Sequence, residues 1–137
     1  MMTAPVLFLC NRNAIRSPMA AALLGDLGVA AESAGVTPGD PDPLSSAALD
    51  EIGLAIPSPP RDVENVKLGR FGLIVALSPQ AQHRALEMTR NLGTPVEYWA
   101  VADPSSVDGS REQRLAAYRA VRDDLLKKLK DRFETGV

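Results

Sequence analysis

The only cysteine of the chain stands at the start of a short polar loop that contains two arginines. Cys10 ends an apolar run, and the string Cys-Asn-Arg-Asn-Ala-Ile-Arg-Ser fills residues 10–17. An alanine- and leucine-rich stretch that opens with Ser17 and Pro18 is typical of a helix, because serine caps helices and proline suits their first turn. A thiol between a strand and a helix N-terminus is well placed for chemistry on an anion, which the helix dipole and free N–H groups attract.

The residue types in this loop indicate nucleophilic chemistry on a tetrahedral oxyanion. Arg16 can clamp two oxygens with its planar guanidinium, and the local positive potential favours the thiolate form of Cys10. Asn13 tolerates the left-handed conformation that a tight loop requires, and Ser17 can donate a hydrogen bond to the sulfur. The residues expected to bind the oxyanion or to support the loop are Asn11, Arg12, Asn13, Ala14, Ile15 and Ser17.

A carboxylate follows a short apolar run near the end of the chain. Asp103 and Pro104 come after residues 96–99, although an Asp-Pro pair taken alone is more often a turn than a reactive group. Ligands of parallel α/β sheets bind at the carboxyl ends of the strands. Because Cys10 ends the first expected strand and Asp103 follows the last, both side chains are predicted to lie at the same edge of the sheet.

The elements that must position these residues alternate between strand-like and helix-like segments, which predicts an α/β domain with a parallel sheet. The predicted strands are the continuously or mostly apolar runs at residues 5–10, 29–34, 71–77 and 96–99. The predicted helices cover residues 18–27, 44–52, 79–92 and 110–133. No repeat, linker or shift in composition divides the chain, so we expect one domain over residues 1–137.

The composition is that of an ordinary globular domain and argues against several classes of protein. Of the 137 residues, 45% are apolar and 23% are charged, and the formal net charge is −2. This balance gives no electrostatic reason to bind nucleic acid or an anionic membrane surface, and no apolar run is long enough to cross a bilayer. One cysteine and one histidine form neither an internal disulfide nor a Cys/His zinc site. We therefore expect no metal and a reducing, cytoplasmic location.

Residues 6–20 closely resemble the low-molecular-weight protein tyrosine phosphatase superfamily, which includes a branch of arsenate reductases. The pattern is a strand, a cysteine, five residues, then arginine and serine, with asparagine three residues after the cysteine. Outside this segment, the Asp-Pro pair and a short Ser-Ala-Gly turn also match, and the resemblance extends over nearly the whole chain. The matching residues are Cys10, Asn13, Arg16, Ser17, Pro18, Met19, Ala20, Ser33, Ala34, Gly35, Asp103 and Pro104.

The resemblance implies a fold and a mechanism. The fold is a four-stranded parallel sheet flanked by helices, the phosphotyrosine protein phosphatase I-like three-layer sandwich. Cys10 attacks phosphorus or arsenic, while Arg16 and the loop N–H groups stabilise the charge of the transition state. Asp103 protonates the leaving oxygen and later activates water. Ser33 helps to brace the loop asparagine, and no bound metal or organic cofactor is needed.

Departures from the phosphatase pattern favour the arsenate-reductase branch. The chain has no aromatic residue between Phe8 and Phe71, and serines follow Asp103-Pro104 where phosphatases usually carry tyrosine. A phosphotyrosine ring would lack its usual aromatic walls, whereas a small inorganic oxyanion would not miss them. Ile15 stands where thioredoxin-coupled reductases carry a second loop cysteine. An arsenate reductase of this kind therefore needs an external thiol, as in the forms coupled to mycothiol or to glutathione with glutaredoxin.

Three hypotheses remain for the same loop. We expect a thiol-coupled arsenate reductase that forms an arsenic adduct on Cys10. The first alternative is a low-molecular-weight phosphatase that hydrolyses phosphomonoesters through a Cys10 phosphoenzyme. The second is a catalytically weak phosphate-binding regulatory module, although anion binding alone requires neither a thiol nor a proton donor. Arg12 replaces a glycine common in phosphatases, and the sequence leaves its role open.

Overall fold

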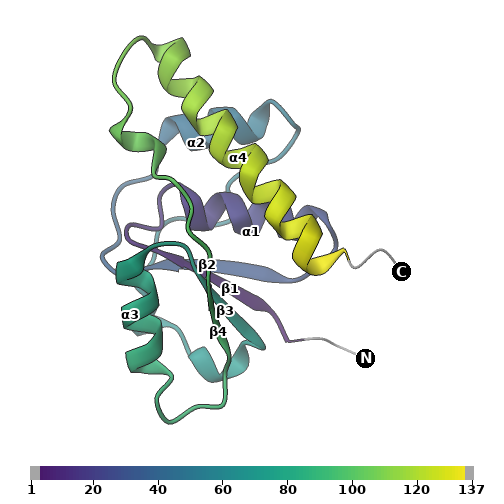
Figure 1. The fold of residues 1–137 in the computed structure, drawn as a ribbon, viewed down its shortest axis with the longest axis vertical. Helices are drawn as coiled ribbons and strands as arrows, with labels where there is room; N and C mark the ends of the chain where they lie inside the picture. Colours follow the sequence, from purple (N-terminus) through teal and green to yellow (C-terminus); the bar gives the residue numbers. More distant parts are fainter. Residues whose placement is uncertain (1–3, 135–137) are drawn as a thin grey trace.

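The computed structural model describes residues 4–134, in which four parallel strands alternate with four α-helices (Figure 1). The strands are β1 (Val6–Cys10), β2 (Ala31–Gly35), β3 (Leu73–Ala76) and β4 (Val96–Tyr98). The helices are α1 (Arg16–Asp26), α2 (Pro43–Asp50), α3 (Pro79–Met88) and α4 (Arg111–Phe133). Short 3₁₀ turns lie at η1 (Val63–Asn65), η2 (Leu68–Arg70) and η3 (Pro104–Ser106). The predicted α/β architecture is confirmed.

Strand β1 occupies the middle of the sheet, whose order is β2-β1-β3-β4. All strand pairs are parallel, and every residue of β1 is buried, as its uninterrupted apolar sequence predicted. After β1 the chain adds β2 on one side, and then crosses to add β3 on the other. The strand order therefore reverses at the carboxyl end of β1, where open α/β sheets hold their ligands. Cys10 is the last residue of β1 and lies at this point.

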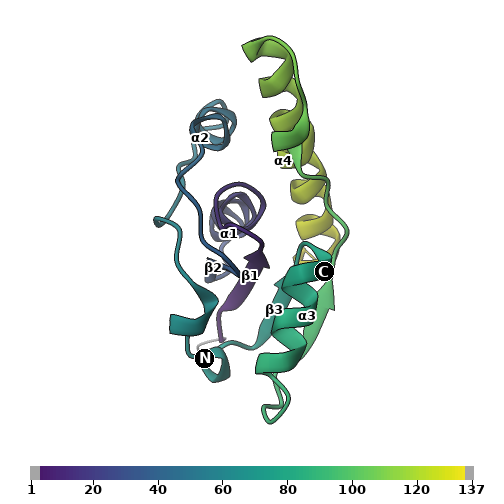
Figure 2. The ribbon, with the colours of Figure 1, turned by 90° about the vertical axis from the view of Figure 1, so that its left-hand side faces the viewer.

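Each face of the sheet packs against its own helices, which gives three layers (Figures 1 and 2). Phe8 and its neighbours on one face pack against α1, α2 and α4, whereas Leu7 and Leu9 on the other face pack against α3, η1 and η2. Alternate residues of β1 thus point to opposite cores, as strand geometry requires. Both cores are apolar and closed, so the loops at the carboxyl ends of the strands rest on a rigid base.

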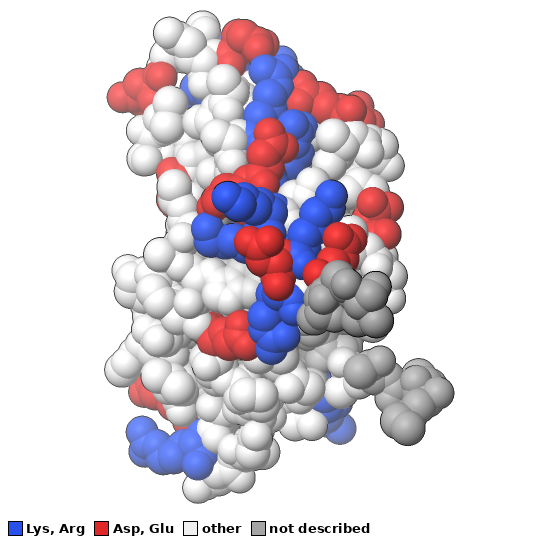
Figure 3. All heavy atoms as spheres, turned by 45° about the vertical axis from the view of Figure 1, so that its right-hand side comes forward, with Lys and Arg blue, Asp and Glu red and all other residues white. Residues whose placement is uncertain are grey.

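The outer face of α4 carries acidic and basic side chains that alternate rather than gather by sign (Figure 3). Arg119 pairs with Glu51 of the segment after α2, and Arg132 pairs with Glu97 of β4. Lys128 pairs with Asp124 one turn away. This face is therefore not a continuous basic patch of the kind that binds nucleic acid. No helix within residues 4–134 is both long enough and apolar enough to span a bilayer.

Candidate active site

The loop after β1 leads directly into the N-terminus of α1, which begins two residues earlier than predicted. Arg16 is the first residue of α1, and Ile15 stands at the N-cap position without any side-chain hydrogen bond to the helix. The prediction that Ser17 caps the helix is therefore wrong, because Ser17 lies inside the first turn. Since no side chain caps the first N–H groups of α1, they remain available for an anion.

A chain of buried side chains holds the cysteine sulfur beneath this loop. The Sγ atom of Cys10 lies 2.9 Å from the hydroxyl of Ser17, which also accepts a hydrogen bond of 2.8 Å from the amide of Asn13. Because the Asn13 amide donates to the Ser17 oxygen, the Ser17 proton can point to sulfur at 2.9 Å or to the more distant carbonyl of Ala34 at 3.4 Å. The network is suited to stabilising the Cys10 sulfur as a thiolate, both before it attacks and when it leaves a covalent adduct.

Asn13 fixes the shape of the loop through its backbone and its side chain. It is the only non-glycine residue within residues 4–134 with a positive φ, at 53°, in agreement with the left-handed conformation predicted for it. Its side-chain oxygen accepts a hydrogen bond of 3.0 Å from the backbone N–H of Arg61. The loop is thus tied to a segment that lies 48 residues further along the chain.

The resemblance had led us to expect that the side chain of Ser33 braces Asn13. Ser33 is buried next to this network, but its side chain makes no hydrogen bond to Asn13. Its hydroxyl oxygen has no hydrogen-bond partner within the described part of the chain. Ser17 and the backbone of Arg61 supply the contacts to Asn13 instead. The carbonyl of Ser33 accepts a hydrogen bond from the Arg61 guanidinium, which also pairs with Glu32. Ser33 therefore supports the loop through its backbone and the position of Arg61.

The Arg61 segment is anchored by a cluster of charges at the edge of β2. Glu32 receives hydrogen bonds from Arg70 and from Arg61. The hydrogen bonds from Arg70, opposed by partial burial and aided by Arg61, lower the pKa of Glu32 to about 2. Glu32 therefore stays ionised at neutral pH and holds Arg61 in the position that supports Asn13.

Gly35, at the end of β2, lies against the backbone of the loop. A Cβ atom at this position would lie 2.8 Å from the nitrogen of Asn13 and 2.9 Å from the carbonyl carbon of Arg12. Both contacts are to main-chain atoms, so they cannot be relieved by a side-chain rotation. The absence of a side chain at position 35 is what allows the loop to turn back over β2.

We expect Gly35→Ala to distort the loop and weaken oxyanion binding. Overpacking of this kind costs about 1–3 kcal/mol, measurable as a lower midpoint of urea denaturation. Phosphate binding, measured by calorimetry, should weaken in the same variant. Gly25→Ala is the matched control, because a Cβ atom at this position in the last turn of α1 meets nothing within 4 Å and should stabilise the helix slightly. Unchanged stability and phosphate affinity in Gly35→Ala would show that the loop is not constrained there.

Arg16 is the buried cation of the site and is held by two strand ends. One terminal nitrogen donates hydrogen bonds to the carbonyl oxygens of Leu77 at 3.2 Å and of Val101 at 3.0 Å. The residue is 8% exposed. With one nitrogen anchored in this way, the other N–H groups of the planar guanidinium remain for an oxyanion.

Asp103 faces Arg16 from the loop after β4. One of its carboxylate oxygens lies 4.0 Å from a terminal nitrogen of Arg16, and the side chain is half exposed. Its other oxygen accepts hydrogen bonds from the backbone N–H and the hydroxyl of Ser105. Partial burial raises the pKa of Asp103, but the Ser105 hydrogen bonds and the charges of Arg16 and Arg12 outweigh it and lower the pKa below its ordinary value.

These side chains surround a pocket of about 120 Å³. The structure brings together most of the residues predicted for the site, while Asn13, Ser17 and Ser33 lie buried behind them. No aromatic residue among residues 4–134 lines the pocket. Within the described residues, no group of three or more His, Cys, Asp and Glu side chains is arranged to hold a metal ion. The lining residues are Cys10, Asn11, Arg12, Ala14, Ile15, Arg16, Asp103 and Ser105.

Three serines contribute to the site although the sequence analysis did not single them out. Ser105 lines the pocket and binds Asp103. Ser78 donates a hydrogen bond of 2.6 Å to the side chain of Asn11, and Ser45 of α2 donates one of 3.1 Å to the carbonyl of Ala14. The position of Ser78 directly after a predicted strand is the one sequence signal that pointed toward this edge of the sheet.

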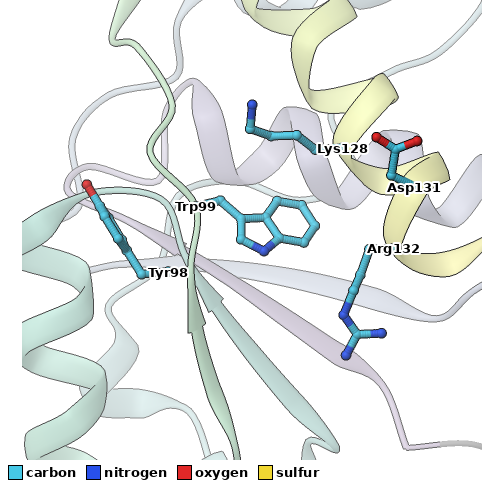
Figure 4. A pocket seen from close by; sticks show the side chains of 5 residues that line it. All are labelled: Tyr98, Trp99, Lys128, Asp131 and Arg132. Carbon is cyan, nitrogen blue, oxygen red and sulfur yellow. The ribbon is translucent and has the colours of Figure 1, made fainter.

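A second hollow, of about 440 Å³, lies between the end of β4 and the last turns of α4 (Figure 4). Its lining residues are Tyr98, Trp99, Lys128, Asp131 and Arg132, none of which belongs to the Cys10 pocket. Arg132 is engaged by Glu97, and Lys128 by Asp124. Trp99 packs edge-to-face against Phe8 of the core. The hollow therefore offers no unpaired cation and no nucleophile.

A cysteine at the end of a central parallel strand, in an anion-binding loop that faces a carboxylate, characterises the enzymes that act on tetrahedral oxyanions through a thiol. The chain belongs to the low molecular weight phosphotyrosine protein phosphatase family, whose family model matches residues 5–135. Members of this family are enzymes that act through a cysteine and use no cofactor.

Curated relatives of the chain include two bacterial arsenate reductases. The arsenate reductase of Bacillus subtilis (strain 168) is 29% identical over 136 residues, with 96% of each chain covered. The arsenate reductase of Halalkalibacterium halodurans is 31% identical, again over 136 residues and 96% of each chain. The similarity therefore extends over the whole length of both relatives.

Solved structures agree with this assignment. The arsenate reductase from Archaeoglobus fulgidus superposes with a TM-score of 0.74 at 30% identity, over 92% of this chain and 96% of that one. The YwlE arginine phosphatase from Geobacillus stearothermophilus has a TM-score of 0.80 at 22% identity, over 97% and 94% of the two chains. The second comparison shows that the fold is shared with a phosphatase.

Proposed function

We propose that this protein is an arsenate reductase that forms an adduct on Cys10 and takes its electrons from an external thiol. The observation that carries the proposal is the Cys10 pocket, which measures about 120 Å³, contains the buried guanidinium of Arg16 and, among the described residues, is lined by no aromatic side chain. Such a pocket suits a small inorganic oxyanion, because a phosphotyrosine ring would find no ring to stack on. The arsenate reductases among the relatives support the same choice.

In the first step, the Cys10 thiolate forms a bond to arsenic, and one oxygen of arsenate leaves as water. Asp103 supplies a proton to this departing oxygen, since its carboxyl group lies at the mouth of the pocket opposite Arg16. Arg16 and the N–H groups of the loop and of α1 stabilise the negative charge that builds up on the remaining oxygens. The hydrogen bond between Ser17 and Sγ keeps the sulfur aligned for attack.

In the second step, an external thiolate attacks the sulfur of Cys10. The sulfur–arsenic bond breaks with its electron pair on arsenic, which is reduced from As(V) to As(III) and leaves as arsenite. A second thiol then attacks the mixed disulfide, releases the oxidised thiol and restores Cys10. In total, arsenate and two thiols give arsenite, one disulfide and water. The external thiol is required because Cys10 is the only cysteine of the chain.

Hydrolysis of phosphomonoesters is the second candidate function, and the same single cysteine favours it. A phosphoenzyme on Cys10 needs only water and a general base for its release, and Asp103 is placed to activate that water. The residues of the first step would be unchanged, with phosphorus in place of arsenic. The two candidates therefore differ in how the Cys10 adduct is resolved.

Parallel turnover measurements distinguish these candidates. One arm supplies p-nitrophenyl phosphate, and the other supplies arsenate with mycothiol or with glutathione and a glutaredoxin. Thiol-dependent production of arsenite above the rate of phosphate release would support the reductase. Phosphatase turnover without thiol-dependent arsenite would overturn it in favour of hydrolysis. Phosphate binding with no turnover in either arm would indicate a regulatory module.

We expect the alkaline limb of the pH–rate profile to belong to Asp103. Its pKa lies below the ordinary value in the free protein, so kcat/KM falls as pH rises from this low range and the general acid loses its proton. A bound oxyanion places negative charge beside Asp103 and partly neutralises Arg16, which raises the pKa in the complex. The alkaline limb of the kcat profile should therefore lie at higher pH than the alkaline limb of the kcat/KM profile.

The variant Asp103→Asn tests this assignment. It should lose the alkaline limb and lower kcat by about 10²–10⁴ for a leaving group that needs a proton. The loss should be smaller for p-nitrophenyl phosphate than for phenyl phosphate, because nitrophenolate leaves more readily without a proton. An Asn variant that retains the limb would assign the titration to another group.

A further inference from the structure

A second guanidinium lies at the mouth of the Cys10 pocket, and the oxyanion cradle does not account for it. Arg12 lines the pocket together with Arg16 and Asp103, but it is exposed where Arg16 is buried. Arg16 is held by two carbonyl oxygens. Within residues 4–134, the guanidinium of Arg12 has neither a hydrogen-bond partner nor a carboxylate within ion-pair distance. All its N–H groups are therefore available to a group that comes from solvent.

The loop after β2 nevertheless holds Arg12 in one place. The N–H of Gly39 donates a hydrogen bond of 2.9 Å to the carbonyl of Arg12, and the N–H of Thr37 donates one of 2.7 Å to that of Asn11. A Cβ atom at position 39 would lie 2.6 Å from Nε of Arg12 and 3.0 Å from one terminal nitrogen. The guanidinium thus lies against the bare backbone of Gly39, where any side chain would displace it.

We propose that Arg12 is a specificity-determining residue that binds a carboxylate on the incoming thiol, so that the enzyme selects low-molecular-weight thiols that carry a carboxylate. This inference rests on the proposed reductase function. The oxyanion fills the small pocket above Cys10, and the thiol must pass the exposed mouth to reach the sulfur. A carboxylate bound to Arg12 would orient the thiol for that attack, through the planar two-pronged geometry that arginine offers to carboxylates.

Binding of two matched phosphonates tests Arg12 without requiring turnover. Methylphosphonate offers the oxyanion alone, and phosphonoacetate adds a carboxylate beside it. Calorimetry should show that Arg12→Gln weakens the binding of phosphonoacetate about five- to tenfold more than that of methylphosphonate, the effect of one exposed charge-assisted contact. Equal weakening of both ligands would place Arg12 in the oxyanion cradle. No change in either would show that Arg12 binds nothing. Both results overturn the proposal.

Two control variants separate position from charge. Gly39→Ala keeps the charge of Arg12 but displaces its flexible end, so it should reproduce part of the phosphonoacetate loss. Arg90→Gln removes the same charge beyond the end of α3, outside the lining of the Cys10 pocket, and should change neither affinity. An equal loss in Arg90→Gln would mean that net charge, and not the placement of Arg12, is responsible.

The kinetic arm compares two thiols in arsenate reduction, 3-mercaptopropionate with a carboxylate and 2-mercaptoethanol without one. Wild-type protein should prefer the carboxylated thiol in kcat/KM, and Arg12→Gln should remove that preference. An unaltered preference in Arg12→Gln would overturn the inference. Failure of the wild-type protein to form arsenite with either thiol would instead contradict the reductase function, while the phosphonate measurement would still decide the role of Arg12.

Discussion

Replacement of Cys10 by serine should abolish turnover and leave oxyanion binding within a few-fold of the wild-type value. A serine hydroxyl is a much weaker nucleophile than a cysteine thiol, and among the described residues the group in contact with Sγ is Ser17, which is not a general base. We expect the loss to be on the order of a thousandfold or more in both the phosphatase and the reductase assay. Steady-state kinetics with p-nitrophenyl phosphate and with arsenate and thiols gives the direct measurement.

Binding and stability measurements make this result interpretable. The loop N–H groups and Arg16 are untouched by Cys10→Ser, so phosphate should still bind when measured by calorimetry. The buried sulfur contributes one side of the contact to Ser17, which a serine oxygen can also form, and the thermal midpoint should change little. Full turnover in Cys10→Ser would remove Cys10 as the nucleophile. Lost turnover together with lost phosphate binding would instead indicate a collapsed loop.

Replacement of Arg16 by lysine should have the second largest effect. The guanidinium performs two tasks at once, because it anchors to the carbonyls of Leu77 and Val101 and presents further N–H groups to the pocket. A lysine ammonium is a single point charge and cannot do both. We expect kcat to fall about 10²–10³-fold and the affinity for phosphate to weaken about tenfold.

The effect of Arg16→Lys on folding stability must be separated from its effect on turnover. A carbonyl that loses its partner in a buried position costs about 1–3 kcal/mol, which urea denaturation will detect. Arg122→Lys is the matched control, because Arg122 is also 8% exposed and donates to a carbonyl, that of Ala48, on the helical side of the fold. It should lose similar stability without loss of turnover. Near wild-type kinetics in Arg16→Lys would show that the planar guanidinium is not needed.

The sequence predicted the order and type of the regular elements, because their hydrophobic patterns are strong. The apolar sequences of β1 and β3 are continuous, which is typical of strands buried on both faces of a sheet. Both strands are found where these runs predicted them. The last helix, predicted over residues 110–133, is found at Arg111–Phe133, and Ser110 and Gln113 form both hydrogen bonds of a capping box at its start. The resemblance to the phosphatase superfamily added the three-layer architecture.

Boundaries were less well predicted where local patterns compete with packing. The helix expected at residues 79–92 ends at Met88, and the strand expected at residues 29–34 lies at Ala31–Gly35. The 3₁₀ turns η1 and η2 lie in a stretch to which the sequence analysis assigned no helix or strand. Their apolar residues, among them Val63 and Leu68, are buried beneath the sheet. Burial of this kind depends on contacts that no local pattern reveals.

The sequence by itself therefore determined the reactive residues and the element on which each lies. A single thiol, an arginine six residues later and a late Asp-Pro pair are local facts, and the alternation of elements places them at one edge of the sheet. Only the tertiary structure decided what holds them there. Arg16 is fixed by Val101, which is 85 residues away, and Asn13 by Arg61, which is 48 residues away. Contacts between segments so distant along the chain arise from the packing of the strands and loops, and so does the bare backbone at Gly39 on which Arg12 rests.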